Sequence, residues 1–271
     1  MRADLHIHSN NSDGTDSVEK IVDKAVAKGL EVIAITDHDN VGGVERAIEY
    51  ANGKILVISG IELSTYSEEN DNLEIHVLGY GIDYKNEELL GKIDEFMRQR
   101  EIRIRKILAL LKEHKIYVSE YDINMDCPGR FAIAKVMLKR KYVSSIQEAF
   151  DKYLGDKGSC YVPSMRVSTV EGVKLLKRVG GTPVLAHPEK YLKRGILEDM
   201  LVRLKTCGLG GMECFYPSHD EETTAKLVAL ADKYGLIKTV GCDYHGKGRS
   251  AEIGQLNVEL DKNTTDILMG K

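Results

Sequence analysis

The chain has 271 residues, of which 30% are charged and 42% hydrophobic, and it carries a formal net charge of −4 at neutral pH. This is the composition of an ordinary globular protein, which excludes a disordered chain, and the negative charge argues against bulk coating of nucleic acid. The length suits one α/β barrel or two domains.

Neither a membrane anchor nor a secretion leader is visible in the sequence. No apolar stretch approaches the ~18 residues that a membrane helix needs. The opening, MRADLHIHS, has no basic and then apolar leader. The five cysteines are scattered and never spaced C-x-x-C, which is typical of reduced thiols. We therefore expect a cytoplasmic protein without membrane contact.

The first part of the chain alternates predicted strands and helices. The strand at 3–8 leads to a helix that Asp16 begins, with Glu19 as its capping-box partner, and that Gly29 ends. The continuous apolar run EVIAIT is typical of a strand buried on both faces of a parallel sheet. The next predicted elements are a helix at Val44–Ala51 and strands at 55–60 and 74–80.

The middle of the chain is predicted to be helical. A long amphipathic helix starts at Asn86 and runs towards His114, and further helices fit Phe131–Lys139 and the stretch from Ser145 to Gly155. Such an excursion predicts an inserted helical cap subdomain at 86–158, between two parts of one barrel at 1–85 and 159–271.

The predicted insert is unusually basic. Residues 92–141 hold thirteen Lys or Arg and seven Asp or Glu, so this span has a charge of +6 and the rest of the chain −10. A solvated helical face and a cap that attracts an anionic substrate both explain this asymmetry.

Strands and helices alternate again after residue 165. Ser168, with Glu171 three residues later, caps a helix that ends near Gly180. The remaining predicted elements are a strand at 183–186, a helix at Leu197–Thr206, a strand at 209–214, a helix at Glu221–Tyr234 and a strand at 236–241. Repeated β–α units predict parallel strands with right-handed crossovers, in a barrel or an open sheet.

The chain contains nine side chains able to bind metal, and nearly all of them lie where an apolar run ends. They are His6, His8, Asp13, His38, Glu62, His76, His187, Asp243 and His245. Taken singly, each has a structural explanation, and a lone H-x-H is a weak signal. Jointly they indicate one multinuclear site, because the carboxyl ends of parallel strands converge on one mouth. Imidazole and carboxylate ligands suit Zn, Mn or Fe.

Four motifs, HIHSNNSDG, TDHD, AHP and CDYH, resemble those of the PHP (polymerase and histidinol phosphatase) superfamily and stand in the same order. The dipeptide Gly129-Arg130, the segment YVSSIQEAFDKYLG and the motif Tyr216-Pro217-Ser218-His219 look like the subgroup that acts on nucleotides. The last motif departs from the family, which often has Ser-Asp-Phe where this chain has Cys242-Asp243-Tyr244. The change removes no ligand.

The resemblance implies a distorted (β/α)7 barrel that holds two or three divalent ions. The first ion would bind His6, His8, Glu62 and Asp243. The second would share Glu62 and add His76 and His187. The third would bind Asp13, His38 and His245. Metal-bridging hydroxide would attack phosphorus, with Mn²⁺ as the first expectation and Fe, Zn or Mg as alternatives. Asp37 and Asp39 are expected to support the ligands rather than bind metal.

Four further residues are expected to contact substrate. Arg130 presents a guanidinium fork that fits phosphate, and its alternative is an exposed salt bridge. His219 would clamp phosphate or protonate the leaving oxygen, although an isolated loop histidine is often a surface residue. Ser218 and Lys135 are further substrate-binding candidates.

These observations predict a metal-dependent phosphoester hydrolase of small nucleotide substrates. The resemblance implies a 3′,5′-nucleoside bisphosphate or nucleoside monophosphate phosphatase, or a 5′-3′ exonuclease of short RNA. One alternative is a histidinol-phosphate-type phosphatase, and another is a metal-binding structural or regulatory module. The partner is expected to be a small phosphorylated substrate, without long nucleic-acid binding.

Overall fold

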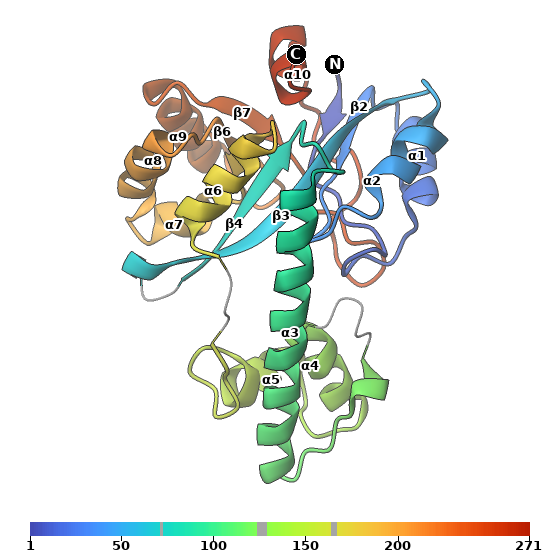
Figure 1. Cartoon of the computed structure of the whole chain (residues 1–271), viewed down its shortest axis with the longest axis vertical. Coiled ribbons are helices and arrows are strands. Elements are labelled where there is room, and N and C mark those ends of the chain that lie inside the picture. The colour runs from blue at the N-terminus through green and yellow to red at the C-terminus, as the bar shows by residue number, and fades with distance from the viewer. Residues whose placement is uncertain (71–72, 124–128, 164–166) are drawn as a thin grey trace. The chain divides into compact units, whose positions relative to one another are not determined.

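The computed structural model describes residues 1–70, 73–123, 129–163 and 167–271. The chain forms two compact units (Figure 1). One, the barrel unit, consists of Met1–Leu90 and Val167–Lys271, and the other, the helical unit, of Gly91–Arg166. The helical unit thus spans residues 91–166, whereas the sequence predicted an insert at 86–158.

The barrel unit contains a seven-stranded sheet whose strands follow one another in chain order. The strands are β1 (Ala3–Asp4), β2 (Val32–Ile35), β3 (Leu56–Ser67), β4 (Leu73–Tyr80), β5 (Thr182–Leu185), β6 (Gly211–Phe215) and β7 (Ile237–Val240). The two ends of the sheet meet, because the Leu5 N–H donates to the Val240 carbonyl at 2.9 Å and Ile7 pairs with Tyr244 in a parallel bridge. The predicted distorted seven-stranded α/β barrel is confirmed.

One strand departs from the predicted parallel arrangement. β4 runs antiparallel to both of its neighbours, β3 and β5. The prediction of parallel strands rested on repeated β–α units, and it does not extend to β4, because the connection from Ser67 to Leu73 is too short for the crossover that a parallel pair needs. The two strands form a hairpin instead.

Strand β2 shows how the barrel buries both of its faces. Ile33 and Ile35 pack with residues of the outer helices, whereas Val32 and Ala34 pack inside the barrel with residues such as Leu78. All four residues of β2 are buried. The continuous apolar run therefore has the two-sided burial that the sequence predicted.

Helices lie between the strands of the barrel unit, and one more helix, α10, follows the last strand (Figure 1). They are α1 (Val18–Ala27), α2 (Val44–Ala51), α6 (Thr169–Arg178), α7 (Glu189–Lys193), α8 (Leu197–Thr206), α9 (Glu221–Lys233) and α10 (Lys262–Leu268). The sequence did not predict α7 and α10, which are too short to show a helical period.

The start of α1 also differs from the prediction. Its N-cap is Ser17, whose side chain accepts a hydrogen bond from the backbone of Lys20. Asp16 instead pairs with Lys24, at 2.6 Å, and accepts a hydrogen bond from the hydroxyl of Tyr244. Its carboxylate is thereby used in tertiary contacts and is not available to cap the helix.

The helical unit has its own core. It contains most of α3 (Glu87–Glu113), together with α4 (Arg130–Lys139), α5 (Ile146–Ala149) and a π-helical turn at Phe150–Leu154. Apolar residues from these elements form one cluster, including Ile107, Leu111, Ile133, Met137 and Leu154. The described part of this unit contains no strand.

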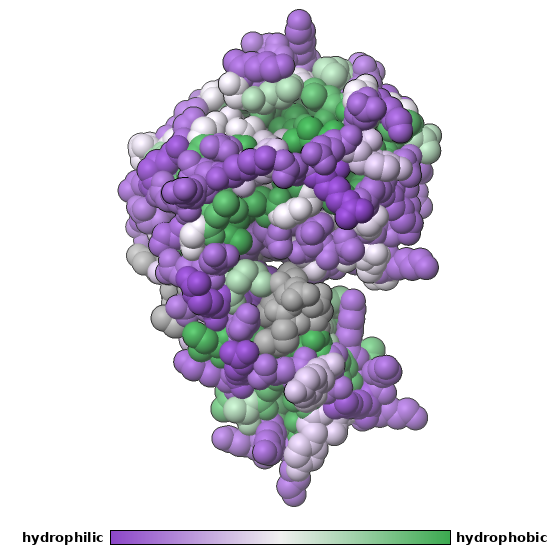
Figure 2. Space-filling view, turned by 45° about the vertical axis from the view of Figure 1, so that its right-hand side comes forward, coloured by the Kyte–Doolittle hydropathy of each residue, from purple (hydrophilic) through white to green (hydrophobic). Residues whose placement is uncertain are grey.

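The surface shown in Figure 2 is mostly hydrophilic, as expected for a chain in which 30% of the residues are charged. Hydrophilic residues cover most of the face in Figure 2, and hydrophobic residues are exposed there in separate patches. Within the described ranges, no helix is both long and apolar enough to cross a membrane. Cys160, Cys207, Cys214 and Cys242 are free thiols, while Cys127 lies outside the described residues.

Glu148 should make the stability of the helical unit depend on pH. Hydrogen bonds from Lys152 and Ser144 lower the pKa of its carboxyl to about 2, against 4.5 as a reference. Because the folded-state pKa is depressed, this stabilisation is complete above about pH 4.5 and is lost as the pH falls through about 2. Glu148→Gln should therefore lower Tm at pH 7, and the deficit should shrink as the pH falls below 4.5. A deficit that is the same at every pH would contradict this prediction.

Candidate metal centre

The structure brings all nine predicted metal-binding side chains together. His6 and His8 follow β1, His38 follows β2, His187 follows β5, and both Asp243 and His245 follow β7. Asp13 lies in the loop after His8. Glu62 and His76 lie within β3 and β4.

Glu62 lies at the centre of this cluster, and its side chain is fully buried. Its Oε2 atom lies 3.3 Å from His6 Nε2, 3.2 Å from His8 Nε2 and 2.9 Å from His38 Nδ1. Its Oε1 atom lies 3.0 Å from both His76 Nδ1 and His187 Nε2. One carboxylate therefore contacts five imidazoles.

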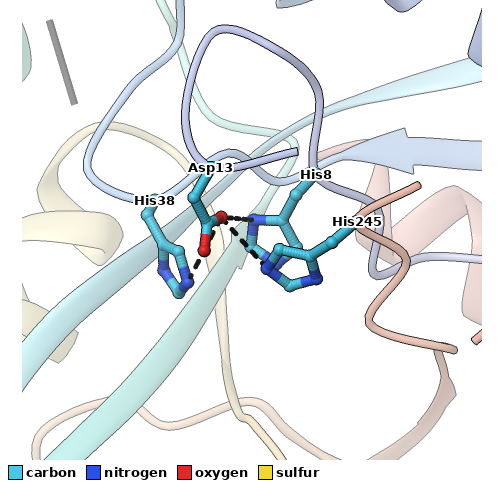
Figure 3. Close-up of side chains that lie close together, drawn as sticks. All are labelled: His8, Asp13, His38 and His245. Carbon is cyan, nitrogen blue, oxygen red and sulfur yellow. Dashed lines mark ion pairs between the residues drawn. The ribbon is translucent and has the colours of Figure 1, made fainter. Parts of the chain in front are cut away.

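Three overlapping groups have ligand atoms that all lie within 4.8 Å of one another, a spacing that suits a metal ion. The first consists of His6, His8, Glu62 and Asp243. The second consists of His8, Asp13, His38 and His245 (Figure 3). The third consists of His38, Glu62 and His76. His8 and His38 thus each belong to two groups, whereas the resemblance assigned each of them to one ion.

In the second group, Asp13 is the centre of the contacts. Its Oδ1 atom lies 3.0 Å from His245 Nε2 and 4.0 Å from both His8 Nδ1 and His38 Nε2 (Figure 3). The remaining carboxylate oxygen, Oδ2, lies 3.1 Å from Arg249 Nη2.

The hydrogen bonding of the cluster fits bound metal. Several buried polar atoms of these residues have no hydrogen-bond partner: His6 Nε2, both ring nitrogens of His8, His38 Nδ1, Glu62 Oε2 and His245 Nε2. Unsatisfied buried polar atoms are costly and uncommon. Divalent cations would satisfy imidazole nitrogens and carboxylate oxygens together, so the donor set fits such ions.

The charges of the cluster point to the same need for cations. Burial lowers the pKa of His8, but the carboxylates of Asp243 and Glu62 beside its ring outweigh burial and raise it to about 10. Burial raises the pKa of Glu62, but the charges of His38, His6 and His76 outweigh it and hold the pKa well below its usual range. The site thus attracts positive charge strongly, whether as protons or as metal ions.

The backbone is strained around these ligands. Asp39, His187 and Asp243 have φ angles of 48°, 31° and 53°, in the left-handed region that residues other than glycine rarely adopt. Such conformations concentrate at functional sites, where the surrounding structure holds them in place. The sequence contained no signal for this strain.

The expected supporting residues hold the loops that carry the ligands. Asp37 accepts hydrogen bonds from Ser9 N, at 2.7 Å, from Ser9 Oγ, at 2.6 Å, and from the hydroxyl of Ser12. It thus fixes the loop between His8 and Asp13. Asp39 accepts a hydrogen bond from the backbone of Ser64 at 2.8 Å.

Two residues beside the centre were given no role by the sequence analysis, although Tyr216 belongs to one of its motifs. Glu213 is buried in β6, with one oxygen 2.9 Å from His6 Nδ1 and the other accepting the His187 backbone N–H at 2.7 Å. The hydroxyl of Tyr216 donates to Asp243 Oδ2 at 3.0 Å. The only available signal for Glu213 was an acid inside the otherwise apolar and small strand sequence LGGMEC.

The predicted substrate residues lie in both units. In the barrel unit, Ser218 Oγ donates to Glu189 at 2.9 Å. The His219 ring lies 5.4 Å from that of Tyr216, and its Nδ1 lies 3.0 Å from the carbonyl of Cys214. His219 Nε2 is buried without a hydrogen-bond partner.

In the helical unit, Arg130 begins α4, and its Nη1 atom lies 3.1 Å from the Leu154 carbonyl and 3.2 Å from Asp156 Oδ1. Lys135 is exposed, with its ammonium 4.6 Å from the ring centre of Phe131. Their contact with substrate stays a prediction.

Curated proteins resemble the chain over nearly its whole length. A phosphoribosyl 1,2-cyclic phosphate 1,2-diphosphodiesterase of Eggerthella lenta is 28% identical, over 94% of this chain and 98% of its own. A 3′,5′-nucleoside bisphosphate phosphatase of Chromobacterium violaceum is 29% identical, over 90% and 87%. A 5′-3′ exoribonuclease of Haemophilus influenzae is 28% identical, over 95% and 94%.

Solved structures and family membership agree with these relatives. A structure from Bifidobacterium adolescentis, assigned as a metal-dependent phosphoesterase, is 25% identical and superposes with a TM-score of 0.85, covering 98% of this chain and 95% of that one. The PHP domain matches residues 4–156, which is more than half of the chain. The resemblance seen in the four sequence motifs is thereby confirmed, and the chain belongs to the PHP domain family.

Proposed function

We propose that this protein is a metal-dependent phosphoesterase that hydrolyses small phosphorylated riboses, above all nucleotides. The observation that carries this proposal is the cluster of nine candidate ligands, five of which have buried nitrogen or oxygen atoms without a hydrogen-bond partner. The PHP family membership and the names of the relatives support it.

The proposed ligand sets are those that the family resemblance implies. The geometry differs from them at two residues: His38 also groups with Glu62 and His76, and His187 contacts Glu62 but joins none of the three groups. His6, His8, Glu62 and Asp243 would hold one ion, and Glu62 with His76 and His187 would hold a second. Asp13, His38 and His245 would hold a third, with His8 Nδ1 close enough to contribute. Divalent ions there would supply Lewis acidity and a nucleophilic water at neutral pH, with Mn²⁺ as our first expectation.

The protein's own side chains would orient these ligands and the substrate. Asp37 fixes the loop that carries Asp13, and Tyr216 fixes one oxygen of Asp243. His219 Nε2 would contact the phosphate or the leaving oxygen, and it would donate to them when the ring is protonated. The ring of Tyr216 lies next to both His187, at 6.0 Å, and His219, at 5.4 Å, so His219 is separated from the proposed ligands by one aromatic ring.

The names of two relatives narrow the substrate class. One relative acts on a phosphoribosyl cyclic phosphate and the other on a 3′,5′-nucleoside bisphosphate. Both substrates are riboses with a second phosphate group besides the one that is hydrolysed. We therefore propose a doubly phosphorylated ribose as the preferred substrate. A cyclic phosphodiester is the second candidate substrate. The Eggerthella lenta relative is named for a 1,2-cyclic phosphate, and the match to this chain covers 98% of that relative.

Metal removal should abolish activity, and metal addition should restore it. The purified protein would be treated with EDTA, reloaded with Mn²⁺, Fe²⁺, Zn²⁺ or Mg²⁺, and assayed for release of phosphate or nucleotide. The substrate panel holds a 3′,5′-bisphosphate, a phosphoribosyl 1,2-cyclic phosphate, 5′- and 3′-mononucleotides, short 5′-phosphorylated RNA and histidinol phosphate. Full activity in EDTA would refute the proposal, and metal binding without turnover of any substrate would favour a structural or regulatory module.

Glu62→Gln should lower the bound metal content by more than one ion per chain. The substitution keeps the side-chain shape but replaces a carboxylate that contacts five imidazoles, so two of the proposed sites lose a shared anionic ligand. Elemental analysis of the dialysed protein measures this loss. Unchanged metal content would remove Glu62 from the ligand set. The inactive variant also controls for contaminating phosphatases.

Arg130→Ala should discriminate between substrates. If the guanidinium holds a second phosphate, loss of a bidentate charge-assisted pair should cost about 2–4 kcal/mol of transition-state binding for a bisphosphate, measured as kcat/KM. A monophosphate should be affected far less, and metal content should not change.

Two controls separate recognition from folding of the helical unit. Arg130→Lys keeps the charge but loses the fork, so it should recover little. Asp156→Asn removes the ion pair at 3.2 Å but keeps the guanidinium, and it should leave kcat/KM nearly unchanged. Equal losses on both substrates would place Arg130 on the scissile phosphate. No loss on either would leave it as a salt bridge of the helical unit.

A further inference from the structure

Glu213 is a buried acid in contact with two of the proposed ligands, although it belongs to none of the three ligand groups. Its side chain is 0% exposed. Its Oε1 atom lies 2.9 Å from His6 Nδ1, and its Oε2 atom accepts the backbone N–H of His187 at 2.7 Å. Burying a carboxylate is costly, so both of its oxygens need such partners.

We propose that Glu213 is a positioning residue that prepares His6 and His187 to bind neighbouring metal ions. The inference rests on the metal centre proposed above. Glu213 would then support two metal sites that have Glu62 in common, since His6 is a proposed ligand of one ion and His187 of the other.

The contact with His6 determines which nitrogen faces the centre as a free ligand. A neutral imidazole carries one N–H, and a carboxylate beside Nδ1 draws that proton to Nδ1. The lone pair is then left on Nε2, which lies 3.3 Å from Glu62 and 3.5 Å from Asp243 and has no hydrogen-bond partner of its own. Glu213 thus presents the ligand nitrogen of His6 towards the proposed ion.

The contact with His187 acts on the backbone. His187 has a φ angle of 31°, a strained conformation for a residue with a side chain. The hydrogen bond from its N–H to Glu213 holds this conformation, and the ring then reaches Glu62 Oε1 at 3.0 Å. The same carboxylate therefore orients one ligand through its ring and the other through its backbone.

Gly241 leaves the space that this arrangement requires. A Cβ atom at Gly241 would lie 2.2 Å from His6 Cβ and 2.5 Å from Glu213 Oε1, closer than real atoms approach. The residue directly after β7 must therefore be glycine, because the backbone lies too close to the His6–Glu213 contact for any side chain.

An amide cannot replace the Glu213 carboxylate, although it has almost the same shape. Both partners present N–H groups, so both oxygens must accept hydrogen bonds. In Glu213→Gln, one partner faces the NH₂ group. If that partner is His6, the imidazole proton is driven to Nε2 and the ligand lone pair is lost. If it is His187, two donors face each other and the strained backbone is released.

The test compares metal affinity in the wild type, in Glu213→Gln and in Glu148→Gln. Each protein would be loaded with Zn²⁺ and titrated with a competing chelator, and the zinc per chain would be measured. We expect Glu213→Gln to lose at least one ion per chain, with roughly 10–100-fold weaker binding. Glu148→Gln makes the same chemical change in the helical unit, and it should keep the wild-type zinc content even where it lowers Tm.

A spectroscopic measurement separates positioning from general destabilisation. In the zinc-loaded wild type, imidazole ¹⁵N shifts should report a proton on Nδ1 of His6 and metal on Nε2, with the signal assigned by its absence in His6→Asn. Glu213→Gln should lose this signature, while circular dichroism of the metal-free protein stays unchanged. A merely structural Glu213 would alter stability but not the His6 signature.

Each outcome decides a different claim. A wild type that binds no divalent metal overturns the proposed function itself. A wild type that binds metal, with the same affinity and His6 signature in Glu213→Gln, overturns only the role of Glu213. If Glu213→Gln does not fold, Glu213→Asp replaces it, because this variant keeps the buried charge but cannot reach both partners. Wild-type zinc affinity in Glu213→Asp would then overturn the inference.

Discussion

The buried carboxylate of Glu62, with five imidazoles around its two oxygens, is the interaction on which the whole centre depends. A carboxylate repels the lone pairs of imidazoles, so N–H donors or positive charge must lie between them. The acids raise the pKa of His8 to about 10 and the imidazoles hold that of Glu62 down, whereas burial lowers the pKa of His187 to about 3. Divalent ions would satisfy the same atoms in place of protons.

The barrel explains how distant segments supply one cluster. Parallel strands deliver ligands just beyond their carboxyl ends, as β1, β2, β5 and β7 do. The antiparallel strand β4 differs, because its candidate ligand, His76, lies within the strand and not beyond its end. In its register with β3, Ser64 pairs with His76 and Glu62 with Leu78, so Glu62 and His76 are diagonal neighbours on one face. A reversed strand thus contributes a ligand from its middle, without disturbing the cluster.

Acids outside the three ligand groups hold this arrangement in place. Asp37 ties down the loop before Asp13, Asp39 ties the backbone of β3, and Glu213 contacts His6 and His187. Each accepts backbone N–H groups, which need a partner when they are buried. The strained φ angles at Asp39, His187 and Asp243 persist because these contacts over-determine the local backbone.

The sequence by itself determined most of the element order and the nine candidate ligands, and its motifs implied the barrel through the family resemblance. Hydrophobic period and capping residues reveal helices such as α6, which Ser168 caps, and the motifs mark strand ends such as the one before His38. Only the tertiary structure decided that β4 is antiparallel and that Asp16 pairs with Lys24 instead of capping α1. It alone placed Glu213 beside two ligands. The partners of Asp16 include Tyr244, and those of Glu213 are His6 and His187, so these contacts join residues far apart in the chain and leave no local period or spacing in the sequence.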